Sequence, residues 1–216
     1  MEKLIIFDLD GTIIDTRADL ANAVNMTREH FRLPALSKDE IVGYVGNGLT
    51  KLMERSFHDK PEVDIKNANS IFMKFYSDYL IIETALYPGV TEGLERIAEK
   101  KYPMAVLSNK PGELCRKITA HFGLGRYFFT VMGGGDASGL KPEPGGIFDI
   151  IKDAGERGFS GTSENIWIIG DNYTDLDAAK NAGIKSIFCT FGFGNRRDSS
   201  SNYSVSNFNE IAGLLL

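Results

Sequence analysis

The sequence predicts an α/β fold in which a Rossmann-like, doubly wound parallel sheet forms the core and an α-helical domain is inserted into it. Short apolar runs alternate with helical stretches, which is typical of βαβ units and a parallel sheet. The predicted strands are apolar over their centres, as expected when helices cover both faces of the sheet. The alternation breaks over residues 15–85, so we assign the core to residues 1–14 and 86–216 and the helical domain to residues 15–85.

The core elements are predicted from the apolar runs and from the capping and terminating residues between them. The expected strands are residues 4–8, 104–108, 130–133, 166–170 and 186–190. Helical patterns cover residues 90–101, 111–122 and 174–183. In the last of these, Thr174 is the expected N-cap and Gly183 the helix stop. Residues 155–165 are expected to form a longer loop.

The inserted domain is predicted to be helical throughout. Its apolar residues recur at roughly helical spacing in four runs, residues 16–31, 37–46, 49–57 and 65–81. We find no convincing strand between them. Because the insertion follows the first strand, it is placed to cover the open end of the sheet.

Composition excludes several classes of protein. A formal net charge of −5 and a pI near 5.3 argue against nucleic-acid binding, which needs a basic surface. No stretch approaches the roughly 18 apolar residues of a membrane span, and the N-terminus lacks the apolar segment of a signal peptide. Cys115 and Cys189 stand alone and are expected to be buried free thiols. These features predict a cytoplasmic protein, monomer or homodimer, with a small-molecule partner.

The stretch FDLDGT, residues 7–12, places two carboxylates at the end of an apolar strand. Residues i and i+2 of a strand share a face, about 7 Å apart, so Asp8 and Asp10 are expected to be neighbours. Two unit charges at that distance repel by about 2 kcal/mol at an effective dielectric constant near 20. The pair therefore indicates a site with a compensating cation.

Further polar residues follow other predicted strands, at the same end of the sheet. Ser108 and Asn109 follow one strand, Asp171 follows another, and Lys141 follows the VMGGG strand. Parallel strands bring these ends together, and ligands of such sheets bind there. Mg²⁺ suits clustered carboxylates and also binds phosphate oxygens. One carboxylate could then attack phosphorus, forming an aspartyl-phosphate, while another moves protons.

Four short motifs carry a family resemblance. DLDGT (8–12), SN (108–109), KPEP (141–144) and GDNYTD (170–175) resemble, in order, the motifs of the haloacid dehalogenase superfamily. The resemblance implies an Asp8 nucleophile and an Asp10 general acid/base. It also implies phosphate stabilisation by Ser108 and Lys141, and a magnesium ion held by Asp8, the backbone carbonyl of Asp10 and Asp171. Asp175 would support the site, and residues 15–85 would be the family's helical cap.

The resemblance also bears on the reaction and the substrate. Dehalogenases of the superfamily lack the second aspartate, so Asp10 favours phosphoryl chemistry. Residues 43–57 resemble the loop and helix that face the active site in phosphoglycolate phosphatases. That resemblance implies substrate contacts by the GNG stretch, and the expected substrate-binding residues are Thr12, Gly46, Asn47, Gly48 and Asn109. One departure is Asn172, where many relatives have serine.

Simpler interpretations exist for several of these residues. Asp171 and Asp175 could cap a helix, because carboxylates complement the macrodipole at its N-terminus. The GNG stretch could be a plain turn, and Lys51 and Arg55 could be solvated.

Weighing these, we expect a Mg²⁺-dependent phosphatase that acts on a small phosphorylated metabolite, with 2-phosphoglycolate as the best substrate guess. The alternatives are a phosphomutase of the β-phosphoglucomutase type or a pyrophosphatase on the same site. An alternative of another class is a non-catalytic regulator that binds phosphate or metal.

Overall fold

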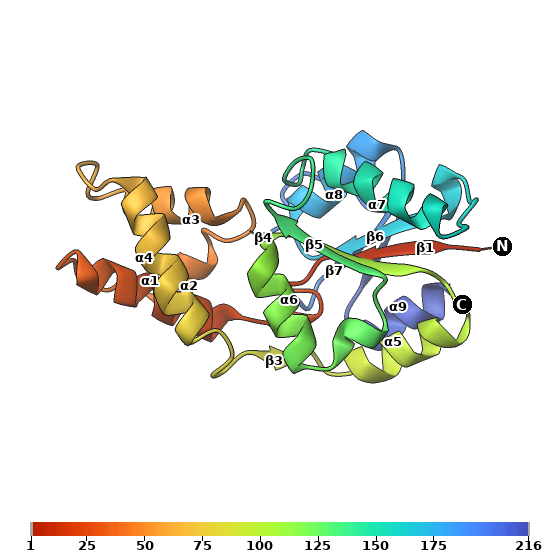
Figure 1. Ribbon diagram of the computed structural model, residues 1–216, viewed down its shortest axis with the longest axis horizontal. Coiled ribbons are helices and arrows are strands. Elements are labelled where there is room, and N and C mark those ends of the chain that lie inside the picture. The colour runs from red at the N-terminus through yellow and green to blue at the C-terminus, as the bar shows by residue number, and fades with distance from the viewer. Residues whose placement is uncertain (1, 216) are drawn as a thin grey trace.

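Residues 2–215 of the computed structural model form a parallel sheet covered by helices on both faces, with a helical module beside one end (Figure 1). The sheet has six strands in the order β5-β4-β1-β6-β7-β8, and every neighbouring pair is parallel. The strands are β1 Leu4–Phe7, β4 Met104–Pro111, β5 Thr130–Gly134, β6 Ile166–Gly170, β7 Lys185–Cys189 and β8 Tyr203–Val205. The predicted α/β fold is confirmed.

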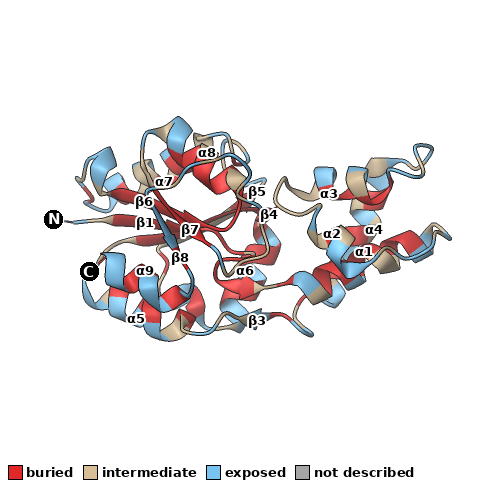
Figure 2. Cartoon of the chain, turned by 180° about the vertical axis from the view of Figure 1, so that it is seen from behind, coloured by how far each residue is buried: buried red, intermediate tan, exposed pale blue. Residues whose placement is uncertain are grey.

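Strand β1 lies at the centre, and its side chains divide the core into two layers. Leu4 and Ile6 face one layer, while Ile5 and Phe7 face the other, and all four are fully buried. Helices α7 (Gly145–Glu156) and α8 (Tyr173–Ala182) cover the first layer. Helices α5 (Val90–Glu99), α6 (Gly112–His121) and α9 (Phe208–Leu215) cover the second (Figure 2). Burial on both faces explains why the strands are apolar throughout.

Two expectations for the core were wrong in detail, and three elements were not predicted. Asn172, and not Thr174, caps α8: its side chain accepts a hydrogen bond from the Thr174 backbone, and Asp175 accepts one from the Asn172 backbone. This capping box satisfies two backbone donors at once. The loop expected over 155–165 is shorter, because α7 continues to Glu156 and a 3₁₀ turn, η2, spans Ser163–Asn165. The structure also adds β8 and α9, which no predicted run covered, as well as the 3₁₀ turn η1 (Leu124–Arg126).

Between strand β1 and helix α5 the chain forms four helices, which we call the helical module. Strand β2 (Ile14–Asp15) leads into it and strand β3 (Ala85–Leu86) leads out, and the two pair antiparallel. Between them lie α1 Arg17–His30, α2 Lys38–Val42, α3 Leu49–Ser56 and α4 Ile65–Asp78. Both crossings of the chain therefore meet at one short ladder (Figure 1).

Two buried charged residues organise the helical module. Arg28 of α1 is fully buried and donates to both carboxylate oxygens of Asp59 at 2.9 Å, and to the Pro34 carbonyl. Asp19 accepts hydrogen bonds from the backbone N–H groups of residues 82–84. Each charge thus has the partners that burial requires. Within residues 2–215, no helix combines the length and apolar character needed to cross a bilayer.

Candidate active site

The carboxyl ends of β1, β4 and β6 open into a cavity of about 70 Å³ between the sheet and the helical module. The core side contributes most of the polar residues predicted from the strand ends: Asp8, Asp10, Ser108, Asn109, Lys141 and Asp171 all line it. The module side is largely apolar and includes Leu20, Leu52 and Phe72. The cavity therefore has a charged floor and an apolar roof.

Lys141 ties two of the carboxylates together. Its ammonium group lies 2.6 Å from Asp8 Oδ1, 2.6 Å from Asp175 Oδ1 and 2.7 Å from the Leu107 carbonyl oxygen, so its three N–H donors are all used. Burial acts to lower the pKa of Lys141, but the negative charges of Asp175 and Asp8 outweigh it and the pKa is raised. Lys141 therefore stays protonated. Asp175 does not line the cavity and supports Lys141 from behind.

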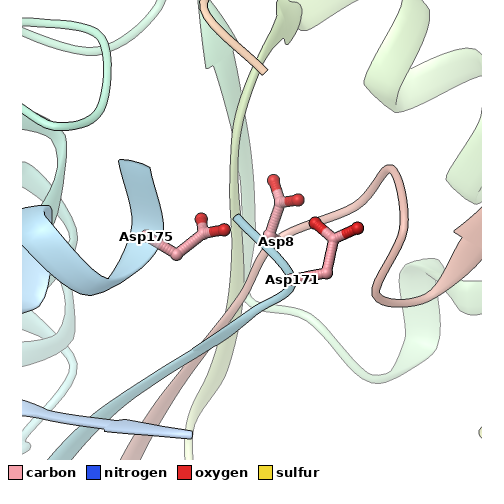
Figure 3. A group of neighbouring side chains, drawn as sticks. All are labelled: Asp8, Asp171 and Asp175. Carbon is pink, nitrogen blue, oxygen red and sulfur yellow. The ribbon is translucent and has the colours of Figure 1, made fainter. Parts of the chain in front are cut away.

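Asp8, Asp171 and Asp175 form a buried acidic cluster, with one oxygen of each within 4.8 Å of the others (Figure 3). Asp171 Oδ2 accepts from the backbone N–H groups of Phe193 and Gly194 at 2.9 and 2.6 Å. Burial raises the pKa of Asp171 well above its usual value, and the charges of Asp8 and Asp175 act in the same direction. Burial also raises the pKa of Asp8, to about 7, although Lys141 opposes it. The cluster thus holds more negative charge than one ammonium compensates.

A hard divalent cation fits this donor set. Asp8 Oδ2 and Asp171 Oδ1 accept no hydrogen bond from the described residues, while their partner oxygens do. Free carboxylate oxygens facing a cavity are the ligands that Mg²⁺ takes, with waters completing its octahedron. Binding such an ion would also relieve the unpaired buried charge.

Asp10 has a cation of its own, which the sequence motifs did not predict. Lys110 of β4 donates to Asp10 Oδ1 and Oδ2 at 3.0 and 2.8 Å, and Thr16 donates to Oδ1 at 2.8 Å. Lys110 also donates to the Tyr76 hydroxyl of α4 at 2.8 Å. Burial acts to lower the pKa of Lys110, but the charge of Asp10 outweighs it and raises the pKa. The available signal was a lysine directly after SN, at the end of an apolar strand.

Asn109 joins the helical module to the end of the sheet that faces the cavity. Its Nδ2 donates to the Gly46 carbonyl at 2.8 Å and to the Lys141 carbonyl at 2.7 Å, while its Oδ1 accepts from the Lys141 backbone N–H at 2.8 Å. Ser108 beside it is buried and lines the cavity, and its Oγ accepts from the Lys110 backbone at 3.3 Å. The SN pair therefore splits into a cavity-facing hydroxyl and a structural amide.

The GNG stretch lies against the core as well as the cavity. Gly46 (φ +113°) and Gly48 (φ +84°) line the cavity, and a Cβ on Gly46 would lie 2.7 Å from Asn172 Nδ2. Both glycines thus adopt backbone angles that side chains disfavour, and a Cβ on Gly46 would force the Asn172 side chain or the loop to shift. Asn47 points away from the cavity and donates to the Tyr173 hydroxyl at 2.6 Å.

Other residues that the sequence singled out lie away from the cavity. Thr12 is fully buried, does not line the cavity, and its hydroxyl has no partner within residues 2–215. Lys51 pairs with Glu54 at the surface, and Arg55 donates to the Tyr44 carbonyl and to Asn47. Cys115 and Cys189 are buried and free, as expected.

Comparison with known proteins places this geometry in context. The chain matches the family described as haloacid dehalogenase-like hydrolase over residues 5–189. It is 31% identical over 220 residues to the phosphoglycolate phosphatase of Colwellia psychrerythraea, covering 97% of this chain and 95% of that protein. It is 30% identical over 213 residues to that of Aquifex aeolicus, covering 99% and 96%. A crystal structure of a predicted phosphoglycolate phosphatase from Haemophilus somnus superposes with a TM-score of 0.89 at 27% identity, covering 100% and 98%.

Proposed function

This chain belongs to the haloacid dehalogenase-like hydrolase family and is a phosphatase, and on that premise we propose that it hydrolyses 2-phosphoglycolate with Mg²⁺ through an aspartyl-phosphate intermediate. The observation that carries the mechanism is the pairing of two differently held carboxylates on one cavity. Asp8 is bound to Lys141 within an acidic cluster, while Asp10 is bound to Lys110 and Thr16. Separate environments suit separate roles.

Asp8 is the proposed nucleophile. A carboxylate oxygen of Asp8 attacks phosphorus, the bond from phosphorus to the ester oxygen breaks, and the leaving alkoxide takes a proton from Asp10. In the second step Asp10 accepts a proton from water, the water oxygen attacks phosphorus, and phosphate leaves as the Asp8 carboxylate is restored. Lys141 fixes the Asp8 carboxylate at 2.6 Å, and the Ser108 hydroxyl is free to donate to a phosphate oxygen.

Asp8, Asp171 and the backbone carbonyl of Asp10 are the proposed holders of Mg²⁺. When bound, the ion would neutralise charge on the phosphoryl group and on the carboxylates beside it. The chain contributes the orientation of its ligands: Lys141 fixes Asp8, and the backbone N–H groups of residues 193 and 194 fix Asp171. Asp175 has a supporting role through Lys141.

The helical module, residues 15–85, is the proposed cap, and residues 1–14 and 86–216 the catalytic core. Support comes from the apolar roof that the module adds to the cavity and from the single ladder, β2 with β3, through which both crossings pass. A cap of this kind excludes water while the ester is cleaved. Among the residues expected to bind substrate, Gly46, Gly48 and Asn109 line the cavity, whereas Thr12 and Asn47 do not. The proposal keeps the two glycines as substrate contacts and gives Asn109 the role of holding Gly46 and Lys141 in place.

The substrate proposal is supported by the relatives in Colwellia and Aquifex, which bear the name phosphoglycolate phosphatase. It is tested by measuring phosphate release with Mg²⁺ from phosphoglycolate, pyrophosphate, sugar phosphates and nucleoside monophosphates. The highest kcat/KM is expected for phosphoglycolate. Conversion of glucose 1-phosphate to glucose 6-phosphate without free phosphate would instead indicate a phosphomutase, and no turnover of any ester would indicate a regulator.

A further inference from the structure

Lys110 offers the substrate a second cation, distinct from the one that holds the nucleophile. We propose that Lys110 binds a second anionic group of the substrate, a carboxylate placed close to the phosphate ester, and that Tyr76 assists it. The inference rests on the proposed function, because it concerns the substrate of the same site. It goes further by naming the residues that select a phosphate ester with a carboxylate over a phosphate ester whose organic group carries no charge.

The distribution of charge singles out Lys110. Within residues 2–215, the cations that line the cavity are Lys110 and Lys141. All three N–H donors of Lys141 are bound to core groups, namely Asp8, Asp175 and the Leu107 carbonyl. The three donors of Lys110 are also bound, but two of them go to the same carboxylate, Asp10, and the third goes to the Tyr76 hydroxyl. Lys110 stands on the other side of Asp10, where the floor of the cavity meets the helical module. Lys110 can give up one of its two bonds to Asp10 and remain paired, whereas each bond of Lys141 holds a different core group, so a second anion of the substrate would meet Lys110.

Tyr76 supplies an independent observation at the same place. Its hydroxyl oxygen accepts a hydrogen bond from Lys110, but its own proton has no acceptor among the described residues. Tyr76 is 1% exposed and lines the cavity. A buried hydroxyl with an unused donor is costly unless a ligand or water accepts it. A carboxylate bound to Lys110 would accept a hydrogen bond from the Tyr76 hydroxyl. Lys110 and Tyr76 together would then donate two hydrogen bonds to one carboxylate, one of them from a charged group.

The side chains that form the rest of the roof are apolar. The residues of the module that line the cavity around Tyr76 include Leu20, Leu49, Leu52 and Phe72. Sugar hydroxyl groups placed there would lose their hydrogen bonds to water without replacement. A short chain ending in a carboxylate would place its apolar carbon against these side chains and its charge on Lys110. Lys110 would keep one hydrogen bond to Asp10 and bridge Asp10 to the substrate.

The test compares two esters that differ in one charge: 2-phosphoglycolate and its primary amide. For the wild-type enzyme with Mg²⁺, we expect kcat/KM to be about 100-fold higher for the acid, or about 2.7 kcal/mol. Lys110→Met keeps the length of the side chain and removes its charge, so it should reduce that ratio to within about threefold of one. Tyr76→Phe should reduce it partially. Lys51→Met, at an exposed ion pair of the module, is the matched control and should leave the ratio unchanged.

A purely structural role for Lys110 makes a different prediction. If Lys110 only positions Asp10, Lys110→Met will slow both esters by the same factor and leave the ratio intact, which overturns the inference. A wild-type ratio near one overturns it without any variant, even if Lys110→Met fails to fold.

Equilibrium binding separates this inference from the proposed function. Calorimetry on Asp8→Asn with Mg²⁺ should give at least tenfold tighter binding of the acid than of the amide, and the added Lys110→Met change should abolish the difference. Tight, selective binding without turnover by the wild type would refute the phosphatase reaction and uphold Lys110. Turnover of both esters at similar kcat/KM would uphold the phosphatase reaction and refute the role of Lys110.

Discussion

The side-chain amide of Asn109 donates a hydrogen bond to the Gly46 carbonyl oxygen at 2.8 Å. Asn109, the second residue of the SN motif, therefore links a core strand to the helical module. The same side chain holds the backbone of Lys141 from both its N–H and its carbonyl. One amide thus fixes both the Lys141 backbone, whose ammonium group binds Asp8, and the Gly46 loop of the roof.

Removing that amide should misplace Lys141. Asn109→Ala leaves the buried Lys141 N–H without a partner, which costs about 1–3 kcal/mol, and we expect kcat/KM to fall about 10- to 100-fold. Asn181→Ala is the control, because Asn181 bonds the neighbouring Pro142 carbonyl at 3.0 Å from the exposed side. Steady-state kinetics should show less than a twofold change there. An equal loss in both variants would contradict the special role of Asn109.

Gly46 should not tolerate a side chain. Gly46→Ala would press a Cβ to within 2.7 Å of the Asn172 side chain at a positive φ, so either the loop or that side chain, which caps α8, must shift. We expect kcat/KM to fall about tenfold or more, since small misplacements at a site are costly. Gly135→Ala is the matched control, with a φ of +92° but open space around its Cβ position. If backbone strain alone mattered, both variants would lose activity alike.

Asp8→Asn should abolish turnover while the protein stays folded. An amide is no nucleophile, so we expect a loss of kcat of ~10³-fold or more. When a reaction with phosphorus-labelled substrate is quenched, no phosphoryl group should be covalently bound to the variant. Circular dichroism should give a cooperative thermal transition for the variant. Retention of wild-type activity would require another nucleophile.

The stabilising effect of Mg²⁺ should grow with pH. The pKa of Asp8 is raised to about 7 and that of Asp171 is raised too, so the metal-free folded protein binds more protons than the unfolded chain. Their contribution to stability is then greatest at low pH and is lost as pH rises through about 7. Mg²⁺ must displace these protons. As the pH falls below the pKa of the carboxyl groups, Mg²⁺ binding therefore weakens by up to about tenfold per pH unit for each proton displaced.

Thermal melts with Mg²⁺ and with a chelator test this expectation. The difference in Tm should be larger at pH 8 than at pH 5.5. A difference that is equal at the two pH values, or larger at pH 5.5, would place the metal on other groups. Chelator should also remove phosphatase activity.

The Arg28–Asp59 pair should matter for the stability of the helical module. Asp59→Ala leaves the fully buried Arg28 guanidinium without its carboxylate, and we expect a loss of about 1–2 kcal/mol, at the low end because Asp59 is partly exposed. Glu62→Ala, which removes an exposed pair with Lys60 at 3.7 Å, is the control and should change stability by less than about 0.5 kcal/mol. Urea denaturation measures both.

The same pair carries a pH dependence of the opposite sign to that of the acidic cluster. Hydrogen bonding to Arg28 lowers the pKa of Asp59 to about 2. Its contribution is therefore complete above pH 4 and is lost as the pH falls toward 2. The Asp59→Ala variant should show less acid sensitivity than the wild type over this range.

The sequence predicts those parts of the molecule where burial dictates residue type. Strand β1 is apolar because both its faces are covered, and the ends of parallel strands must converge, which brings Asp8, Lys141 and Asp171 to one cavity. Strand β8 was missed because it is three residues long and mostly exposed, so it carries no apolar run.

The residues whose surroundings the sequence did not predict depend on distant contacts. Lys110 bonds to residues 100 and 34 positions away, and nothing local distinguishes it from a solvated lysine. Thr12 lies in the turn after β1, where backbone hydrogen bonds to Leu9 set the direction of the chain and strand alternation no longer applies. The role of Gly46 likewise depends on Asn172, which meets it only after folding.

The ladder of β2 and β3 pairs Ile14 with Leu86 and Asp15 with Ala85, so the chain leaves the sheet and returns to it at a single point. A segment spliced between those pairs could be exchanged for another of different length without altering the register of any core strand. The residues at the strand ends of the core would then keep their places while the inserted segment changes.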